Sequence, residues 1–600
     1  MQSMLEEFHY LYKDIQRSGL SLHLYLNEQL QRFNIILTWP RQSLQFTTDA
    51  IHFYLANYNI FFKEVISGIC VSTLMVPEVI AFSYAAHLQP EDGLFATVFM
   101  AIIATLFTKM GGMASGAAGA LAVVTKELMD NAGPLGDISV DERREYVWLT
   151  IIFVGIIQML VGYFKLAKFI KLIPETAMIG FLNGLSILIF ITQLVIFKKC
   201  DGEFSQCSLN NTLYYMDIHT LELWLTILCV SQTIFIMIFF PKTPKIGTII
   251  PSTLVALVFT TSWEHLINRF LLNQSVRTVG DISNINGHFP IPGLPQIANI
   301  RWGVVLLYAA MLALIGLCES IMTLATIGEK LEISMTAEMA VQESFAQGLA
   351  NLTCGLFKTQ GGGAMIAQAI ANLHGGGRYR LSGITVGFSI LILTTTLPMI
   401  INLVPIACLS GVLIVIVFKT FYWKTLFLVF KIPISDTIGI LLVTVLAVLY
   451  NLAAGVIAGV IWTSLCTSCH LSELLKMTAT IDNNEKTYKC EGPLYFGSSH
   501  QFIDQFDIYG DGEFVHLNLS ECYILDYSGV AALDTLYRKY LQNNKTIYIE
   551  EVNEESMKLV MECRVDFLGK NIISNIESME LMDIQTKQTR SGASIEEIDE

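Results

Sequence analysis

Long apolar runs without a charged residue recur along this sequence and limit what the chain can fold into. A membrane-spanning helix needs about 20 apolar residues, because the hydrocarbon core of a bilayer is about 30 Å thick and a helix rises 1.5 Å per residue. Only 15% of the residues are charged, against roughly 25% in a soluble chain, so a water-soluble enzyme is excluded. Runs that suit single spans lie at 146–164, 176–197, 223–241 and 246–263, another begins at 302–318, and 381–418 and 437–472 are each long enough for two.

Shorter apolar stretches complete the membrane region. Three of them, at 65–77, 93–108 and 344–357, can span a bilayer if their flanking charges face protein or water. Two more, at 111–124 and 361–372, are glycine-rich and broken. The sequence therefore predicts about fourteen membrane segments.

Basic residues indicate the orientation of these segments, because positively charged loops stay in the cytoplasm. Their positions on alternate connections predict that both termini are cytoplasmic and that the Asn210 and Asn273 sequons lie outside. Arg143 and Arg144 are an exception to this alternation, but neighbouring acidic residues offset their positive charge. The net charge of −15 argues against a nucleic-acid partner. The basic groups that set this orientation are Lys165/Lys168/Lys171, Lys242/Lys245, Arg378/Arg380 and Lys419/Lys424/Lys431.

The end of the chain differs from its apolar body. The stretch from Lys476 to Glu600 holds 23 acidic and 11 basic residues, so it carries −12 of the net charge of −15. This stretch predicts a small cytosolic α/β domain. We expect its strands at 488–496, 514–519 and 546–549 and its helices at 530–541 and 556–563. We expect four parts: a cytosolic lead-in (1–60), a membrane domain (61–475, with repeats at about 61–265 and 300–475), the α/β domain (476–582) and a disordered acidic tail (583–600).

The two broken segments occupy corresponding places in the two halves of the membrane region. Glu78 precedes Ala120 by 42 residues, and Glu319 precedes Ala367 by 48. Transporters built from inverted repeats place their substrate site where a helix in each half is interrupted. Half-helices beginning near Gly119–Leu121 and near Ala367 would direct free N–H groups and partial positive charge at an anion. The alternative is that the glycines only let helices pack closely.

Two acids inside the membrane region need a reason to be there, because an intramembrane charge costs at least about 2.5 kcal/mol. Glu319 and Thr323 share a helix face and offer oxygen ligands for a hard cation such as sodium. Glu78 follows the helix-bending Pro77 in an apolar setting that disfavours its charged form, as proton coupling requires. The alternative for both is a carboxylate at the end of a span that reaches water.

These segments resemble the sulfate permease and related anion transporter (SulP) family from residue 61 to about 580. Residues 77–82 are similar to its first-span signature, Pro-Glu-Val-Ile-Ala-Phe. The matching later segments are 111–124 (third span), 316–324 (eighth), 347–351 (ninth), and 361–368 with 376–378 and 381–384 (tenth span and exit loop).

The resemblance implies an all-α membrane domain of about fourteen spans in two inverted seven-segment repeats, divided into core and gate and assembled as a homodimer. It implies elevator transport, with the anion held between spans one, three, eight and ten. Phe82 and Leu121 would flank the anion, and backbone around Ala120, Ile366 and Ala367 would bind it.

Three positions depart from the family pattern or leave alternatives open. Gln368 stands where animal members often have a basic residue, which weakens the expectation of chloride exchange. Sodium-coupled bicarbonate relatives carry Asp at the position of Glu319, and some proton-coupled members carry Glu at Glu78, so the coupling ion stays open.

The tail resembles a STAS domain, shared with bacterial anti-sigma factor antagonists. Residues 526–529 are similar to its Asp-Ser-Ser-Gly turn, with Tyr527 in place of the serine that the antagonists have phosphorylated. We expect a structural helix-start turn there, with Ser528 as its cap.

The sequence therefore predicts a secondary transporter of a small inorganic anion in the lipid bilayer, sulfate or bicarbonate, by sodium or proton symport. A dicarboxylate transporter, a nucleobase permease of the same architecture and a membrane-anchored STAS signalling receptor are the alternatives. No catalytic motif or Cys/His metal spacing occurs, so neither an enzyme nor a cofactor beyond a sodium ion is expected. Cys200 and Cys207 could pair, although we favour free thiols.

Overall fold

A computed structural model describes residues 53–166, 174–199, 214–243, 251–282, 285–297, 299–428, 431–450, 452–482, 485–563 and 572–573. The chain divides into two compact units, Met1–Val460 and Ile461–Glu600. Several predictions lie outside the described residues: most of the N-terminal lead-in, the Cys200–Cys207 pair, the Asn210 sequon and the acidic tail.

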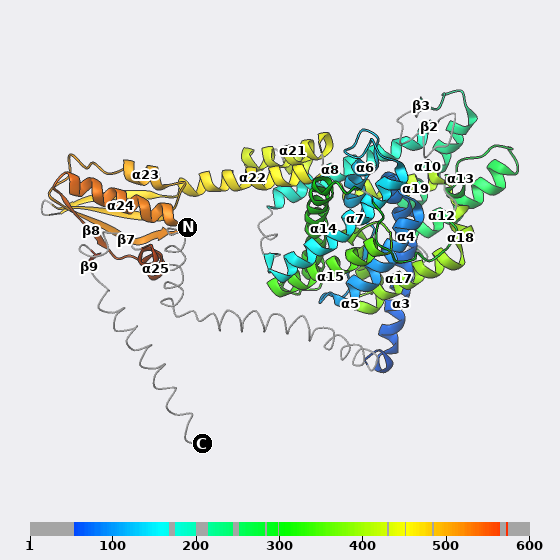
Figure 1. Ribbon diagram of the computed structural model, residues 1–600, viewed down its shortest axis with the longest axis horizontal. Helices are drawn as coiled ribbons and strands as arrows, with labels where there is room; N and C mark the ends of the chain where they lie inside the picture. The colour runs from blue at the N-terminus through cyan, green and yellow to red at the C-terminus, as the bar shows by residue number, and fades with distance from the viewer. Residues whose placement is uncertain are drawn as a thin grey trace, which may run out of the picture. The chain divides into compact units, whose positions relative to one another are not determined.

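The first half of the membrane unit contains seven apolar segments in the described residues (Figure 1). The segments are α3 (Tyr58–Ala85); α4 (Pro90–Phe99), η1 (Met100–Ala104) and α5 (Thr105–Phe107); β1 (Ser115–Gly116) and α6 (Gly119–Met129); α7 (Val140–Tyr163); α8 (Glu175–Gln193) and η3 (Leu194–Phe197); α10 (Leu221–Phe239) and η4 (Phe240–Lys242); and α12 (Ser252–Trp263) and η5 (Glu264–Arg269). The strands β2 (Lys198–Lys199) and β3 (Tyr214–Tyr215) and the helix α13 (Val279–Ile282) lie in the connections.

The second half repeats this order with seven more segments in the described residues. They are α14 (Trp302–Lys330); α15 (Ala337–Leu356); β4 (Gly363–Ala364) and α16 (Ile366–Gly375); α17 (Arg380–Thr396); α18 (Pro398–Asn402) and α19 (Ile406–Thr420); α21 (Ile434–Leu449); and α22 (Leu452–Ser472), with α20 (Thr425–Leu428) in a connection. Within the part of the chain that the structure describes, seven helices are long and apolar enough to cross a membrane by length and composition. The break expected at Pro398 and Pro405 lies between α17 and α19.

The helices of the membrane unit pack in two groups, as expected of a core and a gate. One contains α3, α4, α7, α14, α15 and α17, and the other contains α8, α10, α12, α19 and α21. Glycines bring α7 and α15 close together. A Cβ on Gly155 would lie 2.4 Å from the backbone nitrogen of Leu352 and 2.6 Å from the carbonyl oxygen of Gly348. The close packing that we weighed for the broken segments therefore operates at this helix pair.

Arg143, an exception to the orientation pattern, has a structural role. Its side chain is buried and donates to the carbonyl oxygens of Met129, Gly136 and Ile138. Arg144 forms an ion pair with Asp92 (3.4 Å). Because both cations bind their own loop or a neighbouring helix, they contribute little to the orientation signal.

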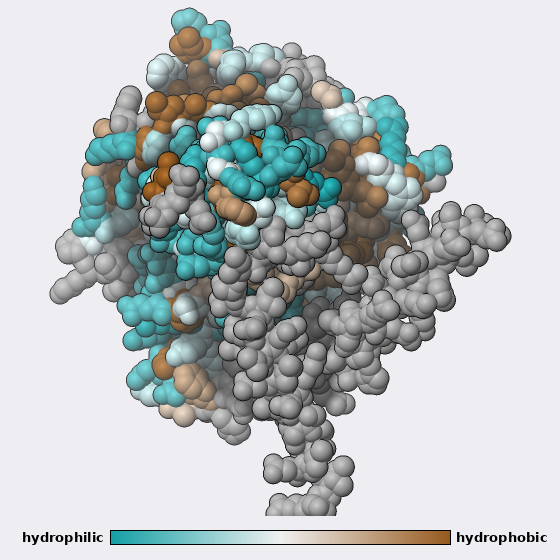
Figure 2. Space-filling model, turned by 90° about the vertical axis from the view of Figure 1, so that its left-hand side faces the viewer, coloured by the Kyte–Doolittle hydropathy of each residue, from teal (hydrophilic) through white to brown (hydrophobic). Residues whose placement is uncertain are grey.

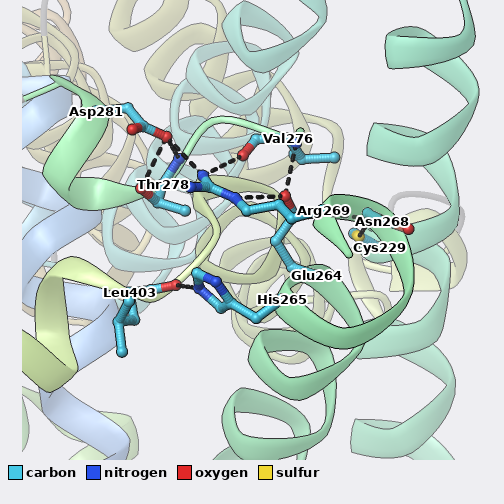
Figure 3. A network of polar contacts seen from close by, with 9 residues as sticks. All are labelled: Cys229, Glu264, His265, Asn268, Arg269, Val276, Thr278, Asp281 and Leu403. Atoms are coloured by element: carbon cyan, nitrogen blue, oxygen red, sulfur yellow. Dashed lines mark hydrogen bonds and ion pairs between the residues drawn. The ribbon is translucent and has the colours of Figure 1, made fainter. Parts of the chain in front are cut away.

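The segment after α12 is held by a buried carboxylate (Figure 3). Glu264 accepts hydrogen bonds from the side chains of Asn268 (2.6 Å) and Arg269 (3.2 Å) and from the backbone nitrogen of Val276 (2.8 Å). Arg269 also contacts Asp281 (3.0 Å), which caps the turn at Thr278. The Glu264 carboxylate is thereby paired with three donors, whereas the side-chain oxygen of Asn268 has no partner in the described residues.

Apolar residues form broad areas of the visible surface in Figure 2. Many large side chains of the membrane unit are exposed, among them Phe235 (61%), Leu307 (59%) and Phe388 (52%). Exposed apolar surface of this extent fits contact with lipid chains rather than water.

The C-terminal unit contains a five-stranded sheet in the order β5-β6-β7-β8-β9, with β5 antiparallel to β6 and the other pairs parallel. The strands are β5 (Lys476–Asp482), β6 (Glu485–Leu494), β7 (Phe514–Ile524), β8 (Thr546–Glu550) and β9 (Ile572–Ile573), and the helices are α23 (Ser499–Asp504), α24 (Tyr527–Gln542) and α25 (Glu554–Glu562). Sequence analysis missed β5, β9 and α23.

The cap expected at the start of α24 was wrong by two residues. Asp526 is the N-cap, and its side chain accepts a hydrogen bond from the backbone nitrogen of Gly529 (3.0 Å). Ser528 is already inside the first turn, because the helix begins at Tyr527. Tyr527 is 69% exposed.

A buried carboxylate organises the interior of the C-terminal unit. The Asp511 side chain is fully buried and accepts hydrogen bonds from Lys486 (2.6 Å), Tyr488 (2.9 Å) and Tyr540 (2.5 Å). The hydrogen bonds from Lys486 to Asp511 and Tyr488 raise the pKa of the lysine above its usual range. This stabilisation is complete below about pH 10 and is lost only as the pH rises through the raised pKa.

We predict that Asp511→Asn destabilises the C-terminal unit by about 1–3 kcal/mol, because it weakens the hydrogen bonds that the buried side chain accepts from Lys486, Tyr488 and Tyr540. Urea unfolding of residues 476–582, which leave out the membrane helix α22, would measure the change at neutral pH. Arg538→Gln is the control, since it removes a surface ion pair with Asp534 and should cost less than about 1 kcal/mol. Equal losses in the two variants would contradict the role of Asp511.

Candidate anion-binding site

The two glycine-rich segments meet as a short antiparallel pair of strands. Ser115 in β1 lies opposite Ala364 in β4, and Gly116 lies opposite Gly363. A half-helix follows each strand, α6 after β1 and α16 after β4. Because the strands are antiparallel, α6 follows the pair at one end and α16 follows it at the other, so the N-terminal ends of both helices lie beside the crossing.

The eighth segment holds β4 in place through two hydroxyl groups. Ser320 accepts a hydrogen bond from the backbone nitrogen of Ala364 (3.0 Å), and Thr323 donates to the carbonyl oxygen of the same residue (3.0 Å). The backbone nitrogen of Met365 donates to the carbonyl oxygen of Ala114 (2.9 Å). Most polar backbone groups of the crossing are thus satisfied by protein, as a non-helical segment in a membrane requires.

Two further side chains support the crossing, and sequence analysis identified neither. The side-chain oxygen of Asn351 accepts a hydrogen bond from the backbone nitrogen of Gly362 (2.9 Å), and its amide nitrogen donates to the carbonyl oxygen of Gly362 (3.0 Å). Thr97 accepts a hydrogen bond from the backbone nitrogen of Ala117 (3.1 Å). Asn351 belongs to the ninth-span motif, but nothing in its local sequence indicates its partner 11 residues away.

The half-helices begin where the sequence predicted, with α6 starting at Gly119 and α16 at Ile366. Neither has a side-chain cap: their N-cap residues are Ala118 and Met365, both in extended conformation. The backbone N–H groups of the first three residues of each helix form no hydrogen bond within the described part of the chain. These amides and the helix dipoles provide positive potential without a Lys or Arg side chain.

The side chains expected around an anion are only partly brought together. The ring of Phe82 packs over Gly119, where a Cβ would lie 2.7 Å from Phe82 Cε1, so Phe82 borders the start of α6. Leu121 is fully buried and points toward Gly316 of α14. Ala120 is also fully buried.

At the second half-helix the three candidate residues differ in exposure. Ile366 is half-buried and Ala367 is exposed, whereas Gln368 is only 2% exposed. The Gln368 amide donates a hydrogen bond to the carboxylate of Glu78 on α3. This contact joins the first and tenth segments, and it gives the glutamine a partner that sequence analysis did not anticipate.

Glu78 on α3 and Glu319 on α14 belong to the two helices that pack against α16 at the crossing. Glu78 is 2% exposed, and Pro77 is accommodated inside α3. One carboxylate oxygen of Glu319 is buried and has no hydrogen-bond partner in the described residues. The structure thus places both acids beside the crossing, one with an amide partner and one with an unsatisfied oxygen.

The sodium site expected at Glu319 and Thr323 stays a prediction. The single hydroxyl proton of Thr323 is shared between the carbonyl oxygens of Glu319 (2.8 Å) and Ala364 (3.0 Å), so the lone pairs of the hydroxyl oxygen are what a cation would bind. The described residues contain no group of three His, Cys, Asp or Glu side chains that could hold a metal ion. A sodium ion here would depend on hydroxyl and carbonyl oxygens together with one carboxylate.

Comparison with known proteins identifies the family. The model of the sulfate permease family matches residues 61–445, and the STAS domain model matches residues 476–579. The chain belongs to the sulfate permease family. YbaR of Bacillus subtilis, named as a proposed sulfate transporter, is 31% identical over 503 residues, which cover 83% of this chain and 96% of YbaR.

More distant relatives support the same architecture. The bicarbonate transporter BicA of Picosynechococcus is 24% identical over 532 residues, covering 84% of this chain and 90% of BicA. The solved structure of SLC26A9 superposes with a TM-score of 0.72 at 16% identity, covering 91% of this chain and 95% of that one. This sulfate permease family protein therefore has a helical membrane transporter core followed by a STAS domain, and its named relatives are transporters rather than enzymes.

We predict that Gly362→Ala disrupts the crossing of this family member. The added Cβ would lie 2.2 Å from the carbonyl oxygen of Gly116, so β1 and β4 would have to separate. The separation should lower the melting temperature of the purified protein by several degrees. Gly303→Ala is the matched control, because nothing lies within 4 Å of its Cβ position. Equal melting temperatures for the two variants would show that the strands do not need this close approach.

Proposed function

We propose that this protein is a secondary active transporter of a small inorganic anion, sulfate or bicarbonate, in a lipid membrane. The observation that carries the proposal is the pair of uncapped half-helices α6 and α16 that begin at one antiparallel strand crossing. Each N-terminus carries about half a positive charge, and its free amides donate hydrogen bonds to an anion. The described part of the chain places no Lys or Arg within either half-helix start, so attraction depends on backbone dipoles.

Such a site selects for charge and size. Oxyanions accept several hydrogen bonds at once, which suits six free amides. The named relatives YbaR and BicA are a proposed sulfate transporter and a bicarbonate transporter, and this supports the same two candidates here. Dicarboxylates remain an alternative, because their carboxylate oxygens also accept several hydrogen bonds at once.

Glu78 and Glu319 are the proposed coupling groups. Glu78 is buried, and one oxygen of Glu319 is buried without a hydrogen-bond partner in the described residues, so ionised forms of both acids would need a compensating cation or proton. Glu319, with its unsatisfied oxygen, is the group to which a sodium ion or a proton would bind, and Gln368 orients Glu78. Transport would then be symport, driven by an ion gradient rather than by ATP.

The remaining features of the proposal concern movement and assembly. The two helix groups would slide against each other in an elevator motion that carries the anion across the membrane. The basic loops favour cytoplasmic termini and a cytoplasmic STAS domain. We also propose a homodimer, which crosslinking in native membranes would test.

Uptake by proteoliposomes tests the proposed function. Labelled sulfate, bicarbonate, succinate and uracil would be offered in separate assays, with and without inward sodium and proton gradients. We expect sulfate or bicarbonate uptake that one of the two gradients accelerates. Uracil uptake alone would favour a nucleobase permease, and no flux of any solute would favour a STAS receptor.

We predict that Glu319→Gln lowers gradient-driven uptake by more than about tenfold, equivalent to about 1.4 kcal/mol, because the neutral side chain no longer binds the coupling cation. Initial rates at saturating anion would measure the loss. Glu329→Gln is the matched control, since this acid is exposed on the same helix. Equal rates in the two variants would remove Glu319 from coupling.

A further inference from the structure

The membrane unit contains several buried carboxylates besides Glu78, and one of them reaches the strand crossing through a glutamine. Glu343 on α15 is 1% exposed. One of its carboxylate oxygens accepts a hydrogen bond from the Thr108 hydroxyl (2.5 Å), and the other accepts one from the Gln347 amide (2.7 Å). A buried acid held only by neutral donors is costly unless it can take up a proton.

The charged residues around Glu343 are engaged elsewhere. Lys109, which follows α5, is paired with Glu338 (3.3 Å), and the Arg380 guanidinium donates to the backbone carbonyl of Thr108. None of the charged groups on the packed elements bonds to Glu343 in the described residues. Those groups are Glu91 and Asp92 on α4, Asp141, Glu142, Arg143, Arg144 and Glu145 on α7, and Glu319, Glu329 and Lys330 on α14.

Gln347 connects Glu343 to the anion site. The same amide nitrogen that donates to Glu343 also donates to the Ser115 hydroxyl in β1 (3.0 Å). Ser115 lies opposite Ala364 in the strand crossing. The amide oxygen of Gln347 is buried and has no hydrogen-bond partner among the described residues. An unpaired buried carbonyl oxygen is unfavourable, so this oxygen is available to accept a hydrogen bond from a new donor.

We propose that Glu343 takes up and releases a proton during transport and acts through Gln347 as a positioning residue for β1. The inference rests on the proposed transport function and adds a residue that the Glu78–Glu319 pair does not include. Ionised Glu343 accepts two hydrogen bonds, which matches the observed arrangement. Protonated Glu343 must donate one, and rotation of the Gln347 amide presents its free oxygen as the acceptor.

This rotation reverses the hydrogen bond at Ser115. The serine hydroxyl accepts from Gln347 when Glu343 is ionised and donates to it when Glu343 is protonated. One polar group of Gln347 stays unpaired in either orientation, so the two states are close in free energy. A proton taken from water and later returned to it therefore changes how β1 is held, at the strand that precedes an anion-binding half-helix.

The test uses full-length protein in proteoliposomes and compares wild type with Glu343→Gln, Glu343→Asp and Glu338→Gln. Glu338→Gln is the matched control, because it removes an exposed acid from the same helix. Labelled sulfate is the probe, or labelled bicarbonate if wild type carries no sulfate. Initial rates and KM would be measured from about pH 5.5 to about pH 8.5, where a perturbed carboxyl group titrates.

Wild type and Glu338→Gln should show a rate that changes about tenfold across this range, as one titrating group produces. Glu343→Gln should keep KM within about twofold and lose the pH dependence, and Glu343→Asp should restore it. A merely structural glutamate would leave the pH profile of Glu343→Gln like that of wild type, and this result would overturn the proposal. A wild-type rate that does not depend on pH would overturn it as well.

A second measurement keeps the inference distinct from the transport function. Infrared difference spectra between the two ends of the pH range report the carbonyl band of a buried protonated carboxylic acid. We expect this band to be smaller in Glu343→Gln than in Glu338→Gln, even if no tested anion is transported. An unchanged band would overturn the proposal for Glu343, whereas absent flux in every variant would count against the transport function alone.

Discussion

The rest of the membrane unit depends on the need to satisfy backbone polar groups where the chain is not helical. Two segments inside the apolar membrane unit lack helical hydrogen bonds. One runs from the end of α5 to the start of α6, and the other from the end of α15 to the start of α16. Strand pairing and side chains such as Ser320 and Asn351 supply the missing partners. The amides that remain free are those at the starts of α6 and α16. The constraint that makes a broken helix costly therefore also leaves donors where an anion could use them.

The acids around the crossing differ in how far their carboxylate oxygens are hydrogen-bonded. Glu78 receives a hydrogen bond from Gln368, and Glu319 keeps an unpaired oxygen. Glu343 lies farther out and reaches the crossing only through Gln347 and Ser115. In the proposed transport function, the site has no fixed Lys or Arg, and ions or protons that bind and leave would compensate the charge of these acids.

The architecture of the membrane unit was predictable, because apolar length and glycine breaks are local signals. The expected half-helix starts at Gly119 and near Ala367 agree with the starts at Gly119 and Ile366. The partnerships were not predictable: Asn351 with Gly362, Gln368 with Glu78, and Gln347 with Ser115 join distant segments. Strand β5 was predictable as well, because Met477, Ala479 and Ile481 alternate with polar residues, but sequence analysis overlooked this short signal after the last apolar run. The cap of α24 was misplaced because Asp526 and Ser528 are both good cap residues, and only the backbone path decides between them.

The central claim is that free backbone amides at the half-helix starts bind the anion. Proline at position 366 removes one such N–H without changing the charge, and the extended residue before it, Met365, already suits a following proline. Equilibrium binding of labelled sulfate or bicarbonate to purified Ile366→Pro and Ile366→Ala measures the effect directly. We expect the proline variant to bind the anion at least about tenfold more weakly than wild type, because it loses a hydrogen bond to a charged group. The alanine variant should bind the anion with near-normal affinity. Equal affinities in the two variants would contradict the central claim.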